Sequence, residues 1–449
     1  MARAKKEAAL TPEERLQAAL VPDWEWPYKL PENWCWTTVG AINQYVGISA
    51  DPTKAKNKTF ELYSVPSSAD NYPEIVLGAD IGSTKQSVKK GDVLLCKINP
   101  RINRVWKVSK YTDHSLLASS EWIVIRNSGL ISNYLMWCFR SSYFRGYMLS
   151  NVSGVGGSLM RAQPKFVQGY PVPVPPLAEQ QRIVDRIESL FAKLDEAKEK
   201  AQAVVDSFET RKAAILHKAF TGELTAKWRE EHGVGMESWE KFKFNELGTL
   251  ERGRSKHRPR NDPKLFGGKY PFIQTGDVAR SGMYITEHTQ TLSELGAEQS
   301  KLFPKGTLCI TIAANIGDVS ILTYDCCFPD SVVGFTPNER TLSEYIYYLM
   351  STLQREIEAN APATAQKNIN LRILNDLLLD IPSVAEQTQI VNQVEYLFFQ
   401  EQHAKEAAEA VLEQIDLMKK SILARAFRGE LGTNDPSEES AVELLKQIF

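Results

Sequence analysis

The stretch from residue 252 to residue 260 concentrates positive charge in a way that suits binding to phosphate groups. It carries five Arg or Lys side chains and no acid, with a glycine and a proline among them. Guanidinium and ammonium groups that neutralise phosphates hold a nucleic acid with a strong dependence on salt. A basic run of this kind is also common in a loop that contacts only water. The five cations are Arg252, Arg254, Lys256, Arg258 and Arg260.

Other polar side chains gather in three pairs of loops at matching places in the two halves of the chain. The pairs are residues 64–70 with 274–277, 97–104 with 313–318, and 153–161 with 362–368. Arg, Lys, Asn and Gln side chains can bond base edges or phosphate oxygens, although such residues also cap turns. The predicted nucleic-acid-binding residues are Lys97, Asn99, Arg101, Asn103, Arg104 and Arg161 in the first half, and Gln274, Asn315, Gln366 and Lys367 in the second.

Motifs for catalysis are missing from the sequence. The string Asn99-Pro100-Arg101-Ile102 lacks the second proline and the aromatic residue with which an adenine methyltransferase would stack a flipped base. The glycines of residues 154–157 follow no expected strand, and no G-x-x-x-x-G-K-[ST] loop for ATP occurs. The six histidines are scattered and the six cysteines show no C-x-x-C spacing, so no metal site is predicted. We predict a binding protein without catalytic residues of its own.

One passage of the sequence occurs twice. Residues 179–224 and 386–431 align without a gap at a constant offset of 207, and 21 of the 46 aligned positions are identical. A repeat this long and this widely separated indicates two copies of a larger unit rather than a solenoid. Each copy follows a proline-containing stop and ends at a glycine, Gly222 or Gly429, which is the usual punctuation of a helix.

Apolar residues in both copies recur at alternating spacings of three and four, as in the seam of a coiled coil. Only Glu401 interrupts the pattern in the second copy, and alanines at the centre of each seam would let antiparallel copies approach closely. We predict an antiparallel two-helix coiled coil, although long helices packed on separate domains would show the same period. The predicted seam positions are Ile183, Ile187, Leu190, Leu194, Ala197, Ala201, Val204 and Phe208 in the first copy, and Ile390, Val394, Leu397, Ala404, Ala408, Val411, Ile415, Met418 and Ile422 in the second.

The segments before the two copies have similar lengths and share landmarks. Both begin at a tryptophan followed by a hydrophobic-Gly pair, and both carry a Lys-Gly pair before a β-type run. The loops between the landmarks differ, and differing loops on a shared frame indicate two different ligand sequences. The predicted order is an N-terminal helical extension (1–30), a mixed α/β domain (31–174), a central helix (175–224), a linker (225–238), a second mixed α/β domain (239–381), a second central helix (382–431) and an acidic C-terminal tail (432–449).

Composition places the chain among ordinary globular proteins, with 43% hydrophobic residues and a net charge of −2. No apolar run is long enough to span a membrane, and the N-terminal segment is too acidic and too poor in apolar residues for a signal peptide. We therefore expect a reduced, cytoplasmic protein. Because the net charge is small, nucleic-acid binding would have to depend on local basic patches.

Antiparallel pairing of two domain-plus-helix units predicts an α+β protein with an internal pseudo-two-fold axis. Roughly forty residues at ~1.5 Å each give a rod of ~60 Å with one domain at each end. Duplex DNA has two-fold axes perpendicular to its own axis, and dimeric readers match them with split sites. One chain with two non-identical heads should therefore read a split, asymmetric site with a fixed gap.

Several motifs resemble the specificity subunit of type I restriction-modification systems, over essentially the whole chain. They are the P-x-x-A-E-Q strings at 175–180 and 382–387, the string Gly-Glu-Leu-Thr-Ala-Lys-Trp at 222–228, and the string Ser-Ile-Leu-Ala-Arg-Ala-Phe-Arg-Gly-Glu-Leu at 421–431. The resemblance implies two target-recognition domains joined by two central helices, which bind a bipartite, asymmetric sequence in double-stranded DNA.

The resemblance also implies partners that carry the chemistry. The expected assembly holds two modification subunits, which are adenine methyltransferases that bind S-adenosylmethionine, and two restriction subunits driven by ATP and Mg²⁺. This chain would be the non-catalytic subunit that places them on DNA. Two alternatives also fit the sequence: a self-contained fused methyltransferase and endonuclease, and a coiled-coil scaffold without a DNA role. Methyl transfer by the pure chain would indicate the first, and a lack of salt-dependent DNA binding would indicate the second.

Overall fold

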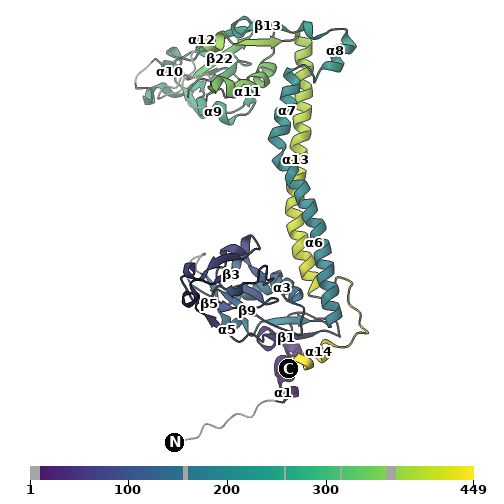
Figure 1. Cartoon of the computed structure of the whole chain (residues 1–449). Helices are drawn as coiled ribbons and strands as arrows, with labels where there is room; N and C mark the ends of the chain where they lie inside the picture. The colour runs from purple at the N-terminus through teal and green to yellow at the C-terminus, as the bar shows by residue number, and fades with distance from the viewer. Residues whose placement is uncertain (1–10, 155–159, 257–258, 314–315, 360–370, 449) are drawn as a thin grey trace. The chain divides into compact units, whose positions relative to one another are not determined.

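The computed structural model describes residues 11–154, 160–256, 259–313, 316–359 and 371–448. The chain forms two compact units, which are considered one at a time (Figure 1). Unit 1 comprises Met1–Ala201 and Ala410–Phe449, and unit 2 comprises Gln202–Glu409. Each unit therefore combines one β-containing domain with parts of long helices that are far apart in the sequence.

Three helices make up the central part of the chain. They are α6 (Leu177–Asp206), α7 (Phe208–Phe220) and α13 (Val384–Ala426). The first central helix is therefore interrupted at Ser207, where the sequence predicts a continuous rod, whereas α13 runs without a break. No helix among the described residues has the length and apolar content needed to cross a membrane.

Unit 1 contains a mixed α/β domain with two main sheets. Its strands are β1 (Cys35–Thr38), β2 (Ser49–Ala50), β3 (Thr59–Tyr63), β4 (Glu74–Leu77), β5 (Lys85–Ser87), β6 (Val93–Cys96), β7 (Val105–Lys107), β8 (Ser115–Ala118), β9 (Trp122–Ile125), β10 (Val152–Ser153), β11 (Arg161–Ala162) and β12 (Pro171–Val174). Its helices are α1 (Pro12–Ala19), α2 (Val39–Ile42), α3 (Ser132–Arg140), α4 (Ser142–Ser150), α5 (Pro164–Val167) and α14 (Ala441–Ile448). The sheets have the orders β2-β5-β8-β3-β4 and β7-β6-β9, and β3 and β8 are parallel.

Unit 2 contains the second mixed α/β domain. Its strands are β13 (Glu240–Lys243), β14 (Gly248–Arg252), β15 (Phe266–Phe272), β16 (Tyr284–Ile285), β17 (Gln290–Leu292), β18 (Leu302–Phe303), β19 (Leu308–Thr311), β20 (Val319–Leu322), β21 (Cys326–Cys327), β22 (Val332–Pro337) and β23 (Leu378–Ile381). Its helices are α8 (Ala226–His232), α9 (Thr275–Arg280), α10 (Glu294–Glu298), α11 (Ser343–Ala359) and α12 (Leu371–Asn375). The sheets have the orders β14-β22-β19-β20-β16 and β17-β15-β21-β18.

The two domains share a frame. In each domain the first strand pairs with the last strand in antiparallel fashion, β1 with β12 in unit 1 and β13 with β23 in unit 2. The last strand of each domain directly precedes a central helix. The Lys-Gly landmarks turn the chain into the buried strands β6 and β19, with Gly91 at φ +93° and Gly306 at φ +86°. This conformation favours glycine, which explains why the Lys-Gly pair occurs in both domains.

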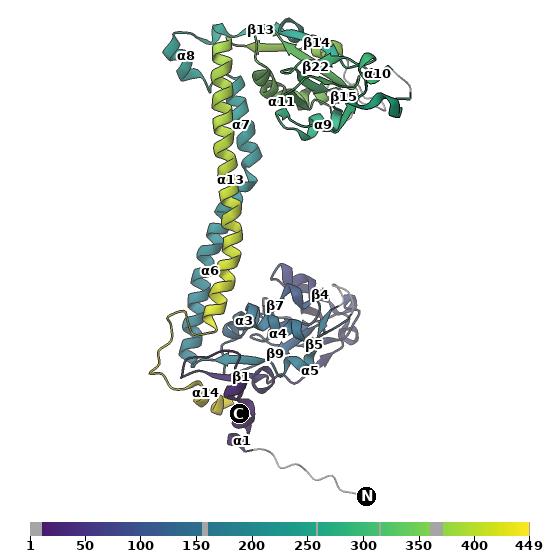
Figure 2. The same ribbon diagram turned by 180° about the vertical axis from the view of Figure 1, so that it is seen from behind.

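The central helices pair in antiparallel fashion within each unit. In unit 1 the start of α6 lies beside the end of α13 (Figures 1 and 2), and Asp195 forms an ion pair with Lys419. In unit 2 Lys405 lies over the ring of Phe208, whereas Lys212 lies over the ring of Phe398. The residue numbers thus rise along α7 as they fall along α13, as the sequence predicts.

The buried face of α13 coincides only in part with the predicted seam. Of the predicted positions, Ile390, Val394, Ala408 and Ile415 are buried, Leu397 and Ile422 are partly buried, and Ala404, Val411 and Met418 are exposed. One residue further on from the exposed positions, Lys405, Leu412 and Lys419 are partly buried. A lysine can lay its aliphatic stem against an aromatic ring and keep its ammonium at the edge. A search for apolar residues alone therefore misses the seam positions Lys405 and Lys419.

The first copy agrees better with its predicted seam. Ile183, Ile187, Ala201 and Phe208 are buried, and the four remaining predicted positions are partly buried. In the second copy Glu401, which interrupts the apolar pattern, is partly buried and pairs with Arg211 at 2.6 Å. An ion pair therefore occupies a seam position in unit 2.

The end of each central helix packs on the domain of the other copy. In unit 2 the ring of Phe220, at the end of α7, meets Tyr345 of α11 edge-on at 5.4 Å. In unit 1 Phe427, just after α13, meets Tyr134 of α3 in the same way at 5.4 Å. Both phenylalanines precede the repeated Gly-Glu-Leu string. This string therefore marks where each helix docks on a domain that it does not follow in sequence.

A buried glutamine ties the start of each central helix to the domain before it. The side chain of Gln180 donates to the carbonyl of Pro175 at 3.0 Å and accepts from the backbone N–H of Ile131 at 2.9 Å. Gln387 makes the same bonds with the carbonyl of Pro382 and the N–H of Leu342, both at 2.9 Å. The P-x-x-A-E-Q string recurs because it supplies both partners of this bond.

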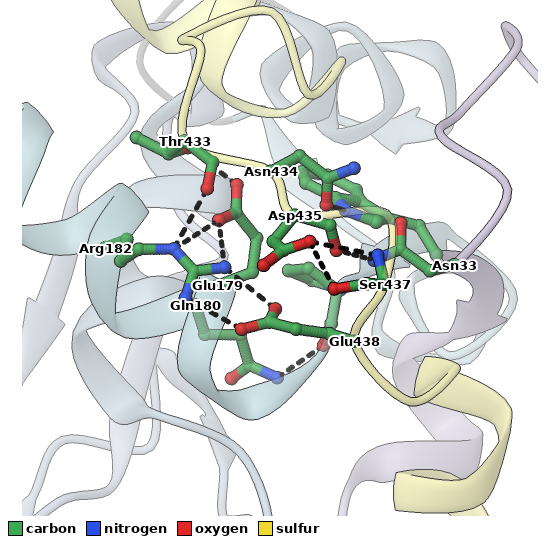
Figure 3. Close-up of polar contacts among 11 residues, drawn as sticks. Asn33, Glu179, Gln180, Arg182, Thr433, Asn434, Asp435, Ser437 and Glu438 are labelled. Atoms are coloured by element: carbon green, nitrogen blue, oxygen red, sulfur yellow. Dashed lines mark hydrogen bonds and ion pairs between the residues drawn. The ribbon is translucent and has the colours of Figure 1, made fainter.

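The glutamate of the same string is buried beside each glutamine. In unit 1 the carboxylate of Glu179 accepts from the hydroxyl of Thr433 at 2.6 Å and pairs with Arg182 at 2.9 Å (Figure 3). Arg182 also forms a two-fold hydrogen bond with Glu438, at 2.8 Å for each oxygen. Burial raises the pKa of Glu179 more than the bonds with Thr433 and Arg182 lower it.

The C-terminal segment is thereby fixed to the beginning of unit 1. The side chain of Asn33 donates to the carbonyl of Asp435 at 2.9 Å (Figure 3). The indole of Trp34 donates to the side chain of Asn434 at 2.9 Å. α14 packs against α1. The predicted acidic tail is thus an ordered part of unit 1 that contains a helix.

In unit 2 the equivalent glutamate is held by a different segment. Glu386 accepts from Arg229 at 2.6 Å, from the hydroxyl of Thr225 at 2.7 Å and from the indole of Trp239 at 3.1 Å. The Arg229 and Glu386 side chains are only 8% and 1% exposed. Arg229 belongs to α8, so the stretch 225–238, expected to be a linker, is packed through a buried ion pair.

We predict that Arg229→Ala destabilises unit 2 by about 3–5 kcal/mol, because it leaves the carboxylate of Glu386 buried without a counter-charge. Urea unfolding of the full chain, followed by hydrogen exchange in α8, measures the change. The double variant Arg229→Ala/Glu386→Gln should recover part of the loss because it also removes the buried charge. A matched Arg182→Ala variant should cost less, since 37% of the Arg182 side chain is exposed. Equal stability of wild type and Arg229→Ala would contradict the prediction.

Candidate nucleic-acid interface

Two of the predicted binding loops of the first domain lie side by side in unit 1. The N–H of Ala162 donates to the carbonyl of Lys97 at 2.9 Å, and the N–H of Asn99 donates to the carbonyl of Met160 at 2.8 Å. Ile98 and Arg161 form an antiparallel bridge. The backbone thus joins the turn 97–104 to the hairpin of β10 and β11, which brings Lys97, Asn99 and Arg161 together.

A third segment, residues 119–121, connects these loops to the end of β3. The N–H of Lys97 donates to the carbonyl of Glu121 at 2.9 Å, and Arg161 pairs with the Glu121 carboxylate at 3.1 Å. The N–H of Ser119 in turn donates to the carbonyl of Tyr63, from which the predicted loop 64–70 begins. The described parts of the three predicted loops of the first domain are therefore linked through residues 119–121.

Hydrogen bonds to neighbouring segments anchor the turn 99–103, from the backbone N–H of Asn99 and from the side chain of Asn103. Asn99 and Asn103 adopt left-handed backbone conformations at φ +48° and +52°, on either side of the buried Pro100. The side chain of Asn103 donates to the carbonyl of Arg140 at 2.9 Å. Asn103 remains a predicted nucleic-acid-binding residue, and its amide nitrogen also anchors the turn. Arg101 is exposed at the tip, and Arg104 is partly buried.

Some of the predicted cations of the second domain contact an acidic residue, and others contact no described acid. Arg260 pairs with Asp330 at 2.8 Å, and Arg252 donates to the carbonyl of the same aspartate. Arg254 and Lys256 are exposed, and no ion pair with another described residue is found for either side chain. Of the five cations, Arg254 and Lys256 are therefore the described ones most available to phosphates.

A small cavity brings three predicted residues of the second domain together. Arg254, Arg260 and Gln274 line a hollow of about 170 Å³ whose apolar part includes Phe266 and Phe272. Gln274, one of the lining residues, donates to the side chain of Gln290 at 2.8 Å. The predicted residues that lie outside the described part of the chain are Arg258, Asn315, Gln366 and Lys367.

A pair of loops in unit 1 that no sequence pattern singled out presents two tyrosines. Tyr72 and Tyr111 are 50% and 45% exposed, and their ring centroids lie 4.8 Å apart. Each follows a residue with positive φ, Asn71 at +52° and Lys110 at +60°. A left-handed lysine is strained and persists only where its surroundings hold it, as at functional sites. The phenol of Tyr63 does so by accepting from the backbone N–H of Lys110 at 3.1 Å.

A buried glutamate holds the same loop. The carboxylate of Glu61 accepts hydrogen bonds from the N–H groups of Tyr111 and Thr112 and from the hydroxyls of Tyr63 and Thr112, at 2.8–3.0 Å. Burial acts to raise the pKa of Glu61, but these bonds outweigh it, so the pKa lies below its usual value. The one sequence signal was an acidic residue inside the apolar strand run Phe60-Glu-Leu-Tyr63.

Two domains with a common frame and different basic loops define a two-headed nucleic-acid-binding protein. The sequence model described as "Type I restriction modification DNA specificity domain" matches residues 47–205 and 236–411, which is more than half of the chain. The chain therefore belongs to the family of type I restriction-modification DNA specificity proteins.

Individual relatives agree with this assignment. The chain is 27% identical to the type I restriction enzyme EcoKI specificity subunit of Escherichia coli K12 over 351 residues, which cover 72% of this chain and 73% of the relative. The crystal structure of the HsdS subunit from Thermoanaerobacter tengcongensis superposes with a TM-score of 0.67 at 21% identity, covering 91% of this chain and all of that one. A chain from a structural study of complex assembly in a type I R-M system gives a TM-score of 0.66 at 22% identity, with coverage of 90% and 100%.

We predict that Arg254→Ala/Lys256→Ala weakens DNA binding for all sequences, because both side chains are free to neutralise phosphates. The slope of log K against log salt should become shallower by up to ~0.9 for each lost contact. Titrations of a labelled duplex at several salt concentrations measure it. Arg260→Ala is the matched control and should change the slope less, because Asp330 already pairs with Arg260. An unchanged slope in the double variant would remove the loop from the interface.

We also predict that Glu61→Gln loosens the loop 109–114, since a neutral amide cannot accept all of the bonds that the carboxylate accepts. Hydrogen exchange at Tyr111 and Thr112 should rise about tenfold or more, from the loss of a charged hydrogen bond. In the wild type, a lowered pKa stabilises the loop at neutral pH, and this protection should fall only as the pH drops below the ordinary glutamate range near 4.3. Glu74→Gln, on the exposed edge strand β4, is the control. Unchanged exchange in Glu61→Gln would show that other contacts hold the loop.

Proposed function

We propose that this chain is the sequence-specific DNA recognition subunit of a type I restriction-modification system. Each mixed α/β domain reads one half of a bipartite, asymmetric target in double-stranded DNA, and the central helices join the two readers. The observation that carries this function is the doubling of one frame with different loops. The loops of both domains hold exposed Arg or Lys side chains, Arg101 and Arg161 in the first and Arg254 and Lys256 in the second.

The partner subunits supply the chemistry in this proposal. Two modification subunits would bind S-adenosylmethionine and methylate adenine, and two restriction subunits would use ATP and Mg²⁺. The sequence of this chain lacks the motifs for either reaction, and the relatives it matches are named specificity subunits. Restriction-modification would take place in the cytoplasm, where this chain meets DNA.

A second face of α13 supports docking of such partners. In unit 2 Tyr396 and Phe399 are 63% and 59% exposed, and in unit 1 Val411, Leu417 and Met418 are 44%, 55% and 49% exposed. Large apolar side chains on a helix that already buries one face indicate further contacts with protein. The proposal assigns this face to the modification subunits.

The test is to sequence the methylome of a host that carries this chain with its modification partners, and of the same host without the chain. We expect one bipartite adenine-methylated motif that depends on the chain. Replacing residues 239–381 with the matching domain of a relative should change one half of the motif and preserve the other, because the frame is common to both domains. The pure chain incubated with DNA and labelled S-adenosylmethionine should transfer no methyl group. Loss of both half-sites after the exchange, or methyl transfer by the pure chain, would contradict the proposal.

A further inference from the structure

The tip of the basic turn in unit 1 exposes an aliphatic side chain. Ile102 is 53% exposed and follows the exposed Arg101 in the turn 99–103. Single exposed apolar residues are common and by themselves need no explanation. Ile102 differs because of the rigidity of its turn and the charge around it.

The turn offers Ile102 in a fixed position. Asn99 and Asn103 hold left-handed conformations at its two ends, and Pro100 is buried beneath it. Asn103 bonds the carbonyl of Arg140 at 2.9 Å, and the guanidinium of Arg145 bonds the carbonyl of Arg101. Strained conformations persist where surrounding bonds impose them, which is typical of binding sites. The side chain is therefore presented with little conformational freedom left in its backbone.

The surroundings of Ile102 are strongly cationic. Arg101, Arg104 and Arg145 belong to or contact the turn, and Lys97 and Arg161 adjoin it through the backbone bonds described above. Glu121 is the acid bonded to this group, and it pairs with Arg161 at 3.1 Å. A ligand that fits this surface has an apolar group in contact with Ile102 and negative charges on either side of that group.

Thymine in duplex DNA has this combination. Its C5 methyl group projects into the major groove between two phosphate backbones, and apolar side chains contact it when a protein reads thymine directly. Arginines beside the tip suit the phosphates or the acceptor edge of guanine. In residues 101–104 an arginine stands on each side of Ile102 and Asn103. This order fits a base step that includes thymine.

We infer that Ile102 reads the methyl group of one thymine in the half-site bound by the first domain, while Asn99 and Asn103 position the turn. This inference rests on the proposed DNA-recognition function. Ile102 discriminates between bases by an apolar contact, whereas Arg101 and its neighbours supply affinity that does not depend on the methyl group.

The experiment uses the full chain and duplexes that carry the target motif found in the methylome. Each thymine on both strands is replaced in turn by deoxyuridine, which removes only the C5 methyl group. For the wild type, one replacement should weaken binding about fourfold, as expected for the loss of one buried methyl-sized group. For Ile102→Ala, the thymine and deoxyuridine duplexes should bind equally at that position.

Two controls separate this role from a general loss of binding. Arg101→Ala should weaken binding to both duplexes by the same factor and keep their ratio. Ile75→Ala removes another exposed isoleucine of unit 1, 44% exposed on β4, and should change neither affinity nor ratio. If no deoxyuridine replacement weakens binding of the wild type, or if Ile102→Ala keeps the fourfold ratio, the inference is wrong. The ratio of the wild-type affinities for the target motif and for a scrambled duplex tests the proposed function separately.

Discussion

The structure depends on a pair of buried polar side chains at the start of each central helix. A glutamine and a glutamate without exposed surface must have hydrogen-bond partners, because a buried polar group left unpaired is costly. Gln180 and Gln387 find theirs in the proline stop before the helix and in the domain that precedes it. This requirement fixes where the helix begins relative to its domain, and it explains why the P-x-x-A-E-Q string is present in both copies.

The adjoining glutamates show how one requirement is met in two ways. The first copy supplies Arg182, three residues after Glu179 on the same helix, whereas the equivalent position in the second copy is Gln389. Unit 2 instead draws Arg229 from α8 into its core. As a result, each central helix is followed by a segment that packs on a buried glutamate. Thr433 makes this contact with Glu179, and Thr225 and Arg229 make it with Glu386. Two units with the same frame therefore differ in the segment that packs on the buried glutamate.

The binding surfaces follow from the contrast between rigid frames and differing loops. In unit 1 backbone bonds join three loops, and two left-handed asparagines fix the turn between them. In unit 2 Arg254 and Arg260 line a cavity, and Arg252 and Arg260 share Asp330 as a partner. Because the central strands and the central helices are common to both units, changes in these loops can alter what each domain binds without altering the assembly.

The sequence alone determined the repeat, the two mixed α/β domains, the antiparallel helices and the location of the basic loops, because identity at a fixed offset, heptad spacing and clustered charge are local properties of the chain. It did not place Lys405 and Lys419 in the seam of α13, since they occupy seam positions through contacts with aromatic rings that no periodicity reveals. Nor did it assign Asn103 to holding a turn, or Glu61 to holding Tyr111, because each partner lies tens of residues away along the chain. Only the tertiary structure decides such roles, since it alone states which donors and acceptors meet once the chain is folded.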